Sequence, residues 1–113
     1  MSYSGGYDLI ITIVKKGFSE NILQASREAG AEGGTIMFGR GAGIHEKAKI
    51  LGIPIEPEKE IILTVIRRNL TGKVLDAIVK AGRLTRPGEG ICFVLELKQV
   101  AGICHQGEGE EEL

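Results

Sequence analysis

The chain has 113 residues, the length of one domain, and we expect residues 1–113 to fold as a single unit. Acidic and basic residues almost cancel to a formal net charge of −1, so nucleic acid is not an expected partner. No apolar run is long enough to cross a membrane, and the first residues do not have the basic and apolar regions of a signal peptide. We therefore expect a cytoplasmic protein.

The first half of the chain predicts a strand, a helix and a second strand. Residues 7–14 (YDLIITIV) are rich in β-branched side chains and too short for a stable helix, so they predict a strand. Apolar positions with helical spacing follow in residues 19–29, where Ser19 is the expected N-cap and Gly30 the stop signal. Residues 34–38 then predict a short second strand.

The second half of the chain repeats this order. Residues 60–66 (EIILTVI) predict a third strand, and residues 71–82 predict a helix with Thr71 as its cap. Residues 90–97 (GICFVLEL) predict a fourth strand. The acidic end, residues 105–113, is expected to be a flexible tail.

This order of elements predicts an α+β, ferredoxin-like βαββαβ fold, in which both helices cover one face of a four-stranded antiparallel sheet. The first, third and fourth predicted strands carry apolar residues on both of their faces. Because the helices cover only one face, the other face needs a different cover, and a further copy of the chain is the simplest one. The sequence therefore predicts a homo-oligomer.

Two glycine-rich turns carry the strongest chemical signal. Gly41-Ala-Gly43 follows the second predicted strand directly after Arg40, and Gly88-Glu-Gly90 leads into the fourth, close to Arg86. Backbone N–H groups at such turns form concave anion sites, and arginine binds phosphate through two parallel hydrogen bonds. Each turn alone is explained more simply as a tight turn. Together they predict an anion site, in which the two turns of an oligomer face each other across a subunit boundary.

Four segments together resemble a known family: Lys16-Gly-Phe18, Ala31-Glu-Gly-Gly-Thr35, Gly41-Ala-Gly43 and residues 76–100 (DAIVKAGRLTRPGEGICFVLELKQV). They are similar to the nitrogen-regulatory PII-like signalling proteins, and the similarity runs from residue 7 to about residue 105. The resemblance implies a homotrimer of ferredoxin-like subunits that binds adenine nucleotides in the clefts between subunits. It also implies a T-loop, here residues 40–58, that docks on a regulated partner protein such as a membrane transporter.

The resemblance also implies which residues form the site. Gly41 and Gly43 would contact the ligand from the base of the T-loop, and Thr35 would lie near the adenine. Residues 100–104 would form the C-loop of the family. The backbone of the B-loop would bind phosphate, helped by arginine side chains: this set comprises Gly88, Glu89, Gly90, Arg86 and Arg40.

Three positions depart from the family pattern. Ile91 stands where the family has a lysine, and Gly102 and Cys104 stand where it has arginines. Since each lost charge-assisted hydrogen bond removes roughly 1.5–3 kcal/mol, we expect AMP, ADP or another small anion as the effector rather than ATP. The nucleotide is an effector ligand, and no cofactor is expected to be required.

The T-loop segment departs from the family as well. It is short and contains no tyrosine, so the family's uridylylation site is absent. Its stretch GIPIEPEKE, residues 52–60, resembles a divergent PII-like branch, which implies regulation of a neighbouring transport or metabolic system. Before that stretch, residues 44–51 favour a turn or two of helix, which Pro54 would end.

Neither histidine indicates a metal site or a catalytic site. His45 and His105 have no Cys-x-x-Cys or His-x-x-x-His spacing around them and no accompanying nucleophile–base pair, so we expect no metal and no enzyme activity. Two alternatives remain open. One is a small phosphate-handling enzyme of the acylphosphatase type, and the other is a trimeric metal-tolerance-type protein that binds no nucleotide.

Overall fold

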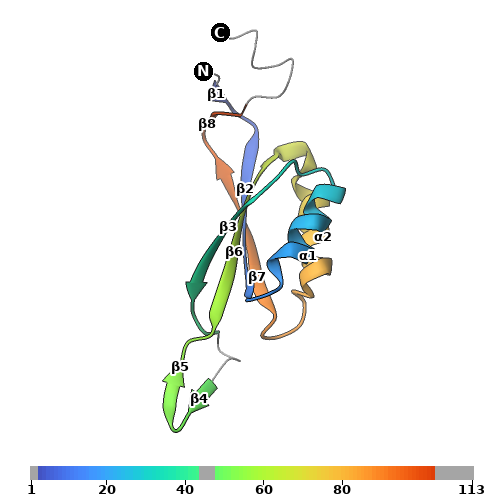
Figure 1. Cartoon of the computed structure of the whole chain (residues 1–113). Helices are drawn as coiled ribbons and strands as arrows, with labels where there is room; N and C mark the ends of the chain where they lie inside the picture. Colours follow the sequence, from blue (N-terminus) through green and yellow to red (C-terminus); the bar gives the residue numbers. More distant parts are fainter. Residues whose placement is uncertain (1–2, 44–47, 104–113) are drawn as a thin grey trace.

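The computed structural model describes residues 3–43 and 48–103 of the chain. Its centre is a four-stranded antiparallel sheet in the order β3–β6–β2–β7, and two helices pack on one face of that sheet (Figure 1). The ferredoxin-like βαββαβ fold predicted from the sequence is confirmed. Its elements are β2 (Tyr7–Lys15), α1 (Ser19–Glu28), β3 (Thr35–Arg40), β6 (Glu58–Arg67), α2 (Arg68–Gly82) and β7 (Gly90–Leu97).

Two small ribbons extend the sheet at opposite ends. β1 (Tyr3–Ser4) pairs with β8 (Val100–Ala101) beside the start of β2, and β4 (Ala48–Ile50) pairs with β5 (Ile53–Ile55) in a hairpin that projects from the other end (Figure 1). The helix predicted for residues 44–51 is therefore wrong over residues 48–51, and residues 44–47 lie outside the described residues. The chain cannot continue as a helix here because it turns back at Leu51 (φ +51°) and Gly52 (φ +80°), which have the positive angles of a two-residue hairpin turn.

Both helices begin at other residues than predicted, and side chains of distant strands contact the first turn of each. Phe18, not Ser19, occupies the N-cap position of α1, and Glu60 of β6 accepts the backbone N–H groups of Gly17 and Ser19 at 3.0 Å each. α2 begins at Arg68, three residues before the predicted cap Thr71. The Thr71 hydroxyl instead donates to Asp8 of β2 at 2.8 Å. None of the described helices is long and apolar enough to span a membrane.

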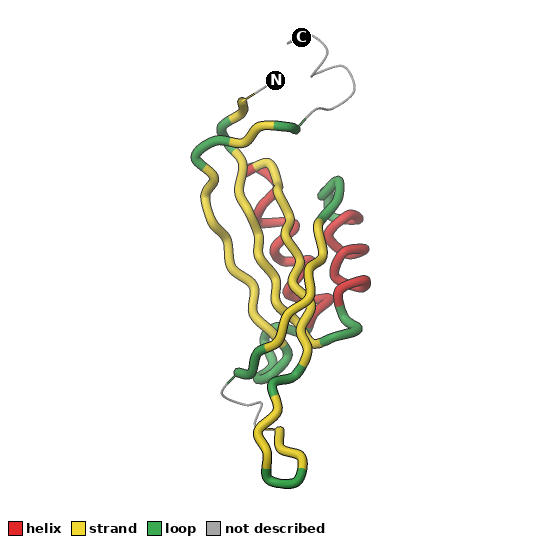
Figure 2. The backbone as a smooth tube through the Cα atoms, turned by 60° about the vertical axis from the view of Figure 1, so that its left-hand side comes forward, coloured by secondary structure: helices red, strands yellow, loops and turns green. Residues whose placement is uncertain are grey.

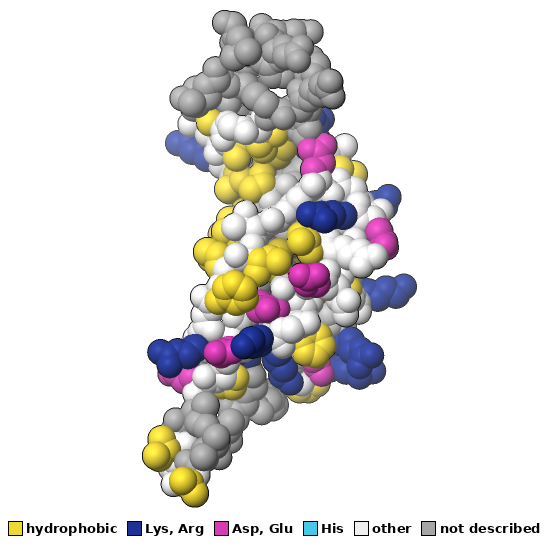
Figure 3. All heavy atoms as spheres, viewed as in Figure 1, with side chains coloured by type: hydrophobic (Ala, Val, Ile, Leu, Met, Phe, Trp, Pro, Cys, Tyr) yellow, Lys and Arg dark blue, Asp and Glu magenta, His cyan; other side chains and the backbone are white. Residues whose placement is uncertain are grey.

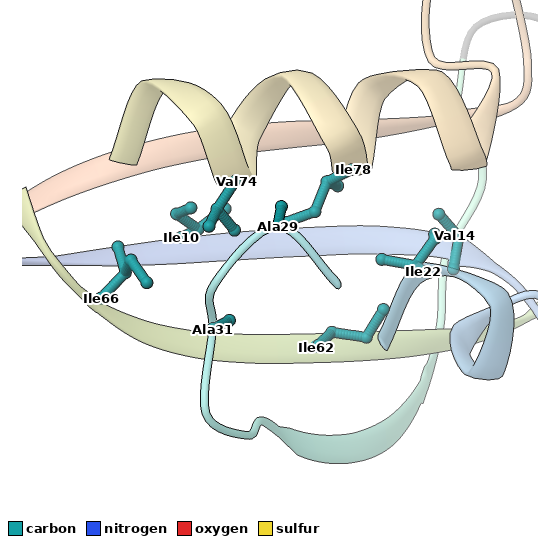
Figure 4. Packing of buried hydrophobic residues seen from close by; sticks show 9 residues of the cluster. All are labelled: Ile10, Val14, Ile22, Ala29, Ala31, Ile62, Ile66, Val74 and Ile78. Carbon is teal, nitrogen blue, oxygen red and sulfur yellow. The ribbon is translucent and has the colours of Figure 1, made fainter. Parts of the chain in front are cut away.

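The hydrophobic core fills the space between the helices and the sheet (Figure 4). Every second residue of β2 and β6 points toward the helices, as the period of a strand requires. These side chains meet the apolar stripes of α1 and α2. The most deeply buried residues of this core, each no more than 1% exposed, are Ile10, Val14, Ile22, Ile62, Val74 and Ile78.

The opposite face of the sheet is also apolar, and no described element covers it (Figure 2). Cross-strand pairing aligns Ile11 of β2 with Leu63 of β6 and Phe93 of β7, so apolar side chains form continuous rows across the strands. We call this surface the open face. Its most exposed large side chains are Met37 (43%), Val65 (41%), Ile91 (56%), Phe93 (39%) and Leu95 (48%).

Candidate functional site

The two glycine turns lie on either side of one hollow at the end of the open face. The hollow has a volume of about 480 Å³, and the central strands contribute Ile13 and Ile61 to its lining. The two turns therefore face each other within a single chain rather than across a subunit boundary. We call this site the glycine-turn hollow. The predicted site residues that line it are Arg40, Gly41, Gly43, Gly88 and Gly90.

The glycines of the second turn are required by the backbone itself. A Cβ atom on Gly90 would lie 2.5 Å from the carbonyl oxygen of Ile13, and Gly90 has φ +150°. Gly88 has φ +81°, a conformation that favours glycine. Gly41 is different, because a Cβ atom there would meet no atom within 4 Å. Gly90 is therefore fixed by the packing of two strands, whereas Gly41 tolerates a side chain.

Two cationic side chains line the glycine-turn hollow. Arg40 is the one predicted from the sequence, and Lys59 is one that sequence reasoning missed. Lys59 lies two residues before Ile61 on the same face of β6 and is only 8% exposed. Continuing the period-two pattern of the strand back beyond Glu60 would have placed it there. Arg86 is exposed and Glu89 is half-buried, and neither of them lines the hollow.

The loop of residues 40–58 is closed at its base by two contacts. The Gly41 N–H donates to the carbonyl oxygen of Pro57 at 3.1 Å, so this amide already has a partner. The Lys16 ammonium lies 2.7 Å from the Glu58 carboxylate. That hydrogen bond lowers the pKa of Glu58 and raises the pKa of Lys16, and the nearby charge of Arg40 lowers the pKa of Glu58 further. Lys16 and Glu58 are therefore both charged near neutral pH, and their contact at the base of the loop is electrostatic.

Glu60 lies next to the base of the loop in sequence, but its carboxylate binds the N-terminus of α1. Hydrogen bonds from the Ser19 hydroxyl and from the backbone N–H groups of Ser19 and Gly17 lower the pKa of Glu60, although burial opposes this shift. The carboxylate is therefore ionised and directed at the N-terminus of α1, where a negative charge is favourable. It points away from the glycine-turn hollow, since Glu60 and Lys59 alternate on β6.

Thr35 lies in a second hollow, which we call the Thr35 hollow. It has a volume of about 280 Å³, and it is lined by apolar side chains such as Leu63 and Val65 and by the glycine-rich segment 30–34. Thr35 begins β3 and Arg40 ends it, which separates them by roughly 17 Å at the rise of a strand. One chain therefore does not bring Thr35 together with the other predicted site residues.

The C-terminal segment reaches the Thr35 hollow. Ile103 lines it, directly after Gly102, one of the positions where the sequence departs from the arginines of the family. Cys104, the other such position, lies outside the described residues. Residues 100 and 101, at the start of the segment expected to be the C-loop, form β8.

Within residues 3–43 and 48–103, no three His, Cys, Asp or Glu side chains gather as a metal site requires. His45 and His105 lie outside the described residues. Cys92 lies half-buried in β7, and its Sγ atom is 3.5 Å from the Thr12 hydroxyl. Burial raises the pKa of this thiol, so it is protonated near neutral pH.

Comparison with known proteins places this geometry in a family. The model of the family "Nitrogen regulatory protein P-II" matches residues 7–107. The crystal structure of PII from Arabidopsis thaliana bound to citrate is similar with a TM-score of 0.65, at 21% identity, over 83% of this chain and 79% of that chain. No curated protein matches the chain in sequence. On the family match, which spans both glycine turns and nearly the whole chain, this chain belongs to the nitrogen regulatory protein P-II family.

Proposed function

We propose that this protein is a non-enzymatic signalling protein that binds a small anionic effector and regulates a partner protein in response. Membership of a family of regulatory signalling proteins supports the general role. The observation that carries the proposal is the glycine-turn hollow, where both predicted turns meet two cationic side chains, Arg40 and Lys59. Backbone turns and paired cations are the elements from which phosphate sites are built.

The open face supports assembly as a homotrimer. Large apolar side chains are exposed there in rows, and a soluble monomer rarely leaves so large an apolar surface uncovered. A ring of three chains covers this face in every subunit. We propose that in such a ring the Thr35 hollow of one subunit lies next to the glycine-turn hollow of its neighbour. Each cleft then combines both halves of the predicted site.

AMP or ADP fits this combined cleft. The apolar lining of the Thr35 hollow, with Leu63 and Val65, suits an adenine ring, and the glycine-turn hollow suits its phosphates. Ile91 lines the latter where the family has a lysine, so Arg40 and Lys59 are the two cationic side chains that the described residues bring to it. Two cationic side chains balance the negative charge of one or two phosphate groups better than that of a triphosphate.

A polycarboxylate is the second candidate for the anion. The Arabidopsis thaliana PII structure is described as bound to citrate, so a PII protein holds a compact anion with several carboxylates. Arg40 and Lys59 bind carboxylate by the same charge-assisted hydrogen bonds that bind phosphate. Citrate therefore belongs in any survey of ligands for this chain.

The loop of residues 40–58 is the element whose conformation would change when the ligand binds. Arg40 lines the hollow at one end of this loop, and Glu58, at the other end, is held by Lys16. The hairpin within the loop exposes Leu51 (95%) and Ile53 (66%) at and beside its tip. An anion that moves Arg40 changes the base of this loop, and the apolar tip offers a contact to a regulated protein such as a transporter.

Titration calorimetry tests the proposal and separates the alternatives. The purified protein is titrated with AMP, ADP, ATP, cyclic AMP and citrate, with and without magnesium, while phosphate release is measured in the same samples. Binding without phosphate release, weakened by Arg40→Gln and Lys59→Gln and unchanged by Lys80→Gln, an exposed lysine on α2 outside the predicted site, supports the sensor. Phosphate release favours the enzyme of the acylphosphatase type. No binding of any ligand contradicts the proposal and favours a protein without a nucleotide role.

A further inference from the structure

A third hollow, distinct from the Thr35 hollow, lies beside the glycine-turn hollow at the same end of the sheet. It has a volume of about 560 Å³ and is lined by Lys16, Phe38, Gly39, Arg40, Glu58 and Lys59. Figure 3 shows Lys and Arg side chains gathered at this end of the body, next to the hairpin. The ring of Phe38 stands 74% exposed there.

The proposed trimer does not account for the exposure of Phe38. In the ladder, Phe38 of β3 is opposite Glu60 of β6, whose side chain points to the helix layer. Its neighbour Met37 pairs with Ile61 and points to the open face. A partner copy seated on the open face therefore covers Met37 and leaves Phe38 in solvent.

A second aromatic side chain is exposed close by. Phe18 is 44% exposed in the turn between β2 and α1. The Glu60 carboxylate accepts the N–H groups of Gly17 and Ser19, the residues on either side of Phe18. Phe18 and Phe38 therefore flank the same buried carboxylate. We call Lys16, Phe18, Phe38 and Arg40 the Phe38 patch.

The hollow beside Phe38 has more positive than negative side chains, even with Lys16 paired to Glu58. The hollow beside Phe38 is lined by three cations, Lys16, Arg40 and Lys59, and by one carboxylate, Glu58. The other nearby carboxylate, Glu60, is hydrogen-bonded to the N-terminus of α1. Apolar rings among excess positive charges complement an apolar side chain among negative ones. Nucleic acid fits less well, because it gains affinity from many neutralised phosphates and the chain has a net charge of −1.

We propose that the Phe38 patch is a docking surface for an extended acidic segment of a partner protein, in which an aromatic side chain is flanked by Asp or Glu. The aromatic side chain packs against Phe38 and Phe18, and the flanking carboxylates pair with Lys16 and Arg40. This surface is separate from the hairpin tip and from the open face.

The docking surface also gives the effector a means of control, a step that rests on the proposed function. Arg40 and Lys59 line both the glycine-turn hollow and the hollow beside Phe38. An anion in the first hollow and an acidic segment on the Phe38 patch therefore compete for the same cations. Each ligand weakens the binding of the other by the same factor, as linkage requires.

The test is an NMR titration of the ¹⁵N-labelled full chain with the peptide Glu-Glu-Phe-Glu-Glu, blocked at both ends. We expect shifts of the amides of Lys16, Phe18, Phe38 and Arg40. Phe38→Ala weakens peptide binding about fivefold or more, as loss of a central aromatic anchor does. Lys16→Gln weakens it about twofold, and Lys80→Gln, an exposed lysine on α2, leaves it unchanged. ADP at saturating concentration weakens peptide binding.

Four results would overturn the docking surface. They are an absence of shifts at these amides, equal binding of Glu-Glu-Ala-Glu-Glu, preferential binding of a short single-stranded oligonucleotide, and a change in oligomeric mass on Phe38→Ala. The outcome is separable from the nucleotide site, because Phe38 does not line the glycine-turn hollow. Phe38→Ala that loses the peptide and keeps the nucleotide confirms the patch. A chain that binds the peptide and no nucleotide refutes the effector site alone.

Discussion

Replacing Leu95 with glutamate places a charge on the open face, on its edge strand β7. Leu95 is opposite Leu9 in the ladder of β2 and β7 and is 48% exposed in the single chain. In a trimer, Leu95→Glu forfeits the burial of about half a leucine side chain, worth about 1 kcal/mol. It also buries an unpaired carboxylate at a cost of several kcal/mol. Because symmetry repeats the change in all three subunits, the trimer loses on the order of 10 kcal/mol or more.

The assay for this change is sedimentation equilibrium of the purified protein. We expect the unaltered chain to sediment at three times its mass of 12.1 kDa, and Leu95→Glu to sediment at or near the mass of one chain. The matched control is Leu51→Glu at the hairpin tip, which adds the same charge far from the open face and should leave the trimer intact. A trimeric Leu95→Glu variant, or an unaltered chain that is monomeric, would refute the role we give to the open face.

Three further predictions concern stability, measured by urea denaturation at a fixed protein concentration. Glu60→Ala should lower the free energy of unfolding by roughly 2–4 kcal/mol because two backbone N–H groups lose their acceptor, whereas Glu60→Gln keeps an acceptor and should cost about 1 kcal/mol; equal losses would contradict this. The folded pKa of Glu60 lies below its ordinary value of 4.5, so its contribution should be complete above pH 4.5 and disappear as pH falls through the folded pKa. Glu60→Gln should remove that part of the pH dependence, and an unchanged acid transition would argue against it. Gly90→Ala should destabilise the fold by at least about 2 kcal/mol, since its Cβ would lie 2.5 Å from the Ile13 oxygen, and Gly41→Ala should change stability by less than about 0.5 kcal/mol. Similar effects of the two changes would contradict the distinction between the turns.

The fold was predictable because its signals are local. Strands such as β2 and β7 are short β-branched or apolar runs, and the stripes of α1 and α2 have helical spacing. The first residues of the helices were not predictable from local signals, because the groups that contact their first turns come from segments far apart in the chain. Glu60 reaches the start of α1 from 41 positions away, and Asp8 reaches Thr71 across 63.

The hairpin of residues 48–55 shows a local signal that misled. Residues such as Lys49 and Leu51 favour a helix by propensity, and Pro54 reads as its end. In the structure Leu51 and Gly52 take positive φ angles and turn the chain back, so that Pro54 pairs with Lys49 as part of β5. The hairpin turn at Leu51 and Gly52 therefore determined the structure of this segment, rather than the helix propensity of its residues.

About half of the candidate site could be predicted from the sequence, because closely spaced glycines next to predicted strands indicate tight turns. The turns at Gly41 and Gly88 follow and precede strands, and sheet topology brings them to one end of the open face. Lys59 was missed because the predicted strand began at Glu60 and the predicted T-loop ended at residue 58, so Lys59 was assigned to no face of the sheet, whereas β6 begins at Glu58. Thr35 and Arg86 stay predictions, since Thr35 lies in a separate hollow and Arg86 does not line the glycine-turn hollow.

Subunit complementation tests the central claim most directly, that each ligand site combines the Thr35 hollow of one subunit with the glycine-turn hollow of the next. Thr35→Trp fills the first hollow and Arg40→Glu reverses a charge in the second, so each variant alone should form trimers that bind no effector. When equal amounts are co-refolded, about one quarter of the clefts receive an unaltered half from each neighbour. We predict that calorimetry then recovers about one quarter of the sites, with the affinity of the unaltered protein. Mixed trimers that bind nothing, or a Thr35→Trp variant that binds normally, would contradict a site shared between subunits.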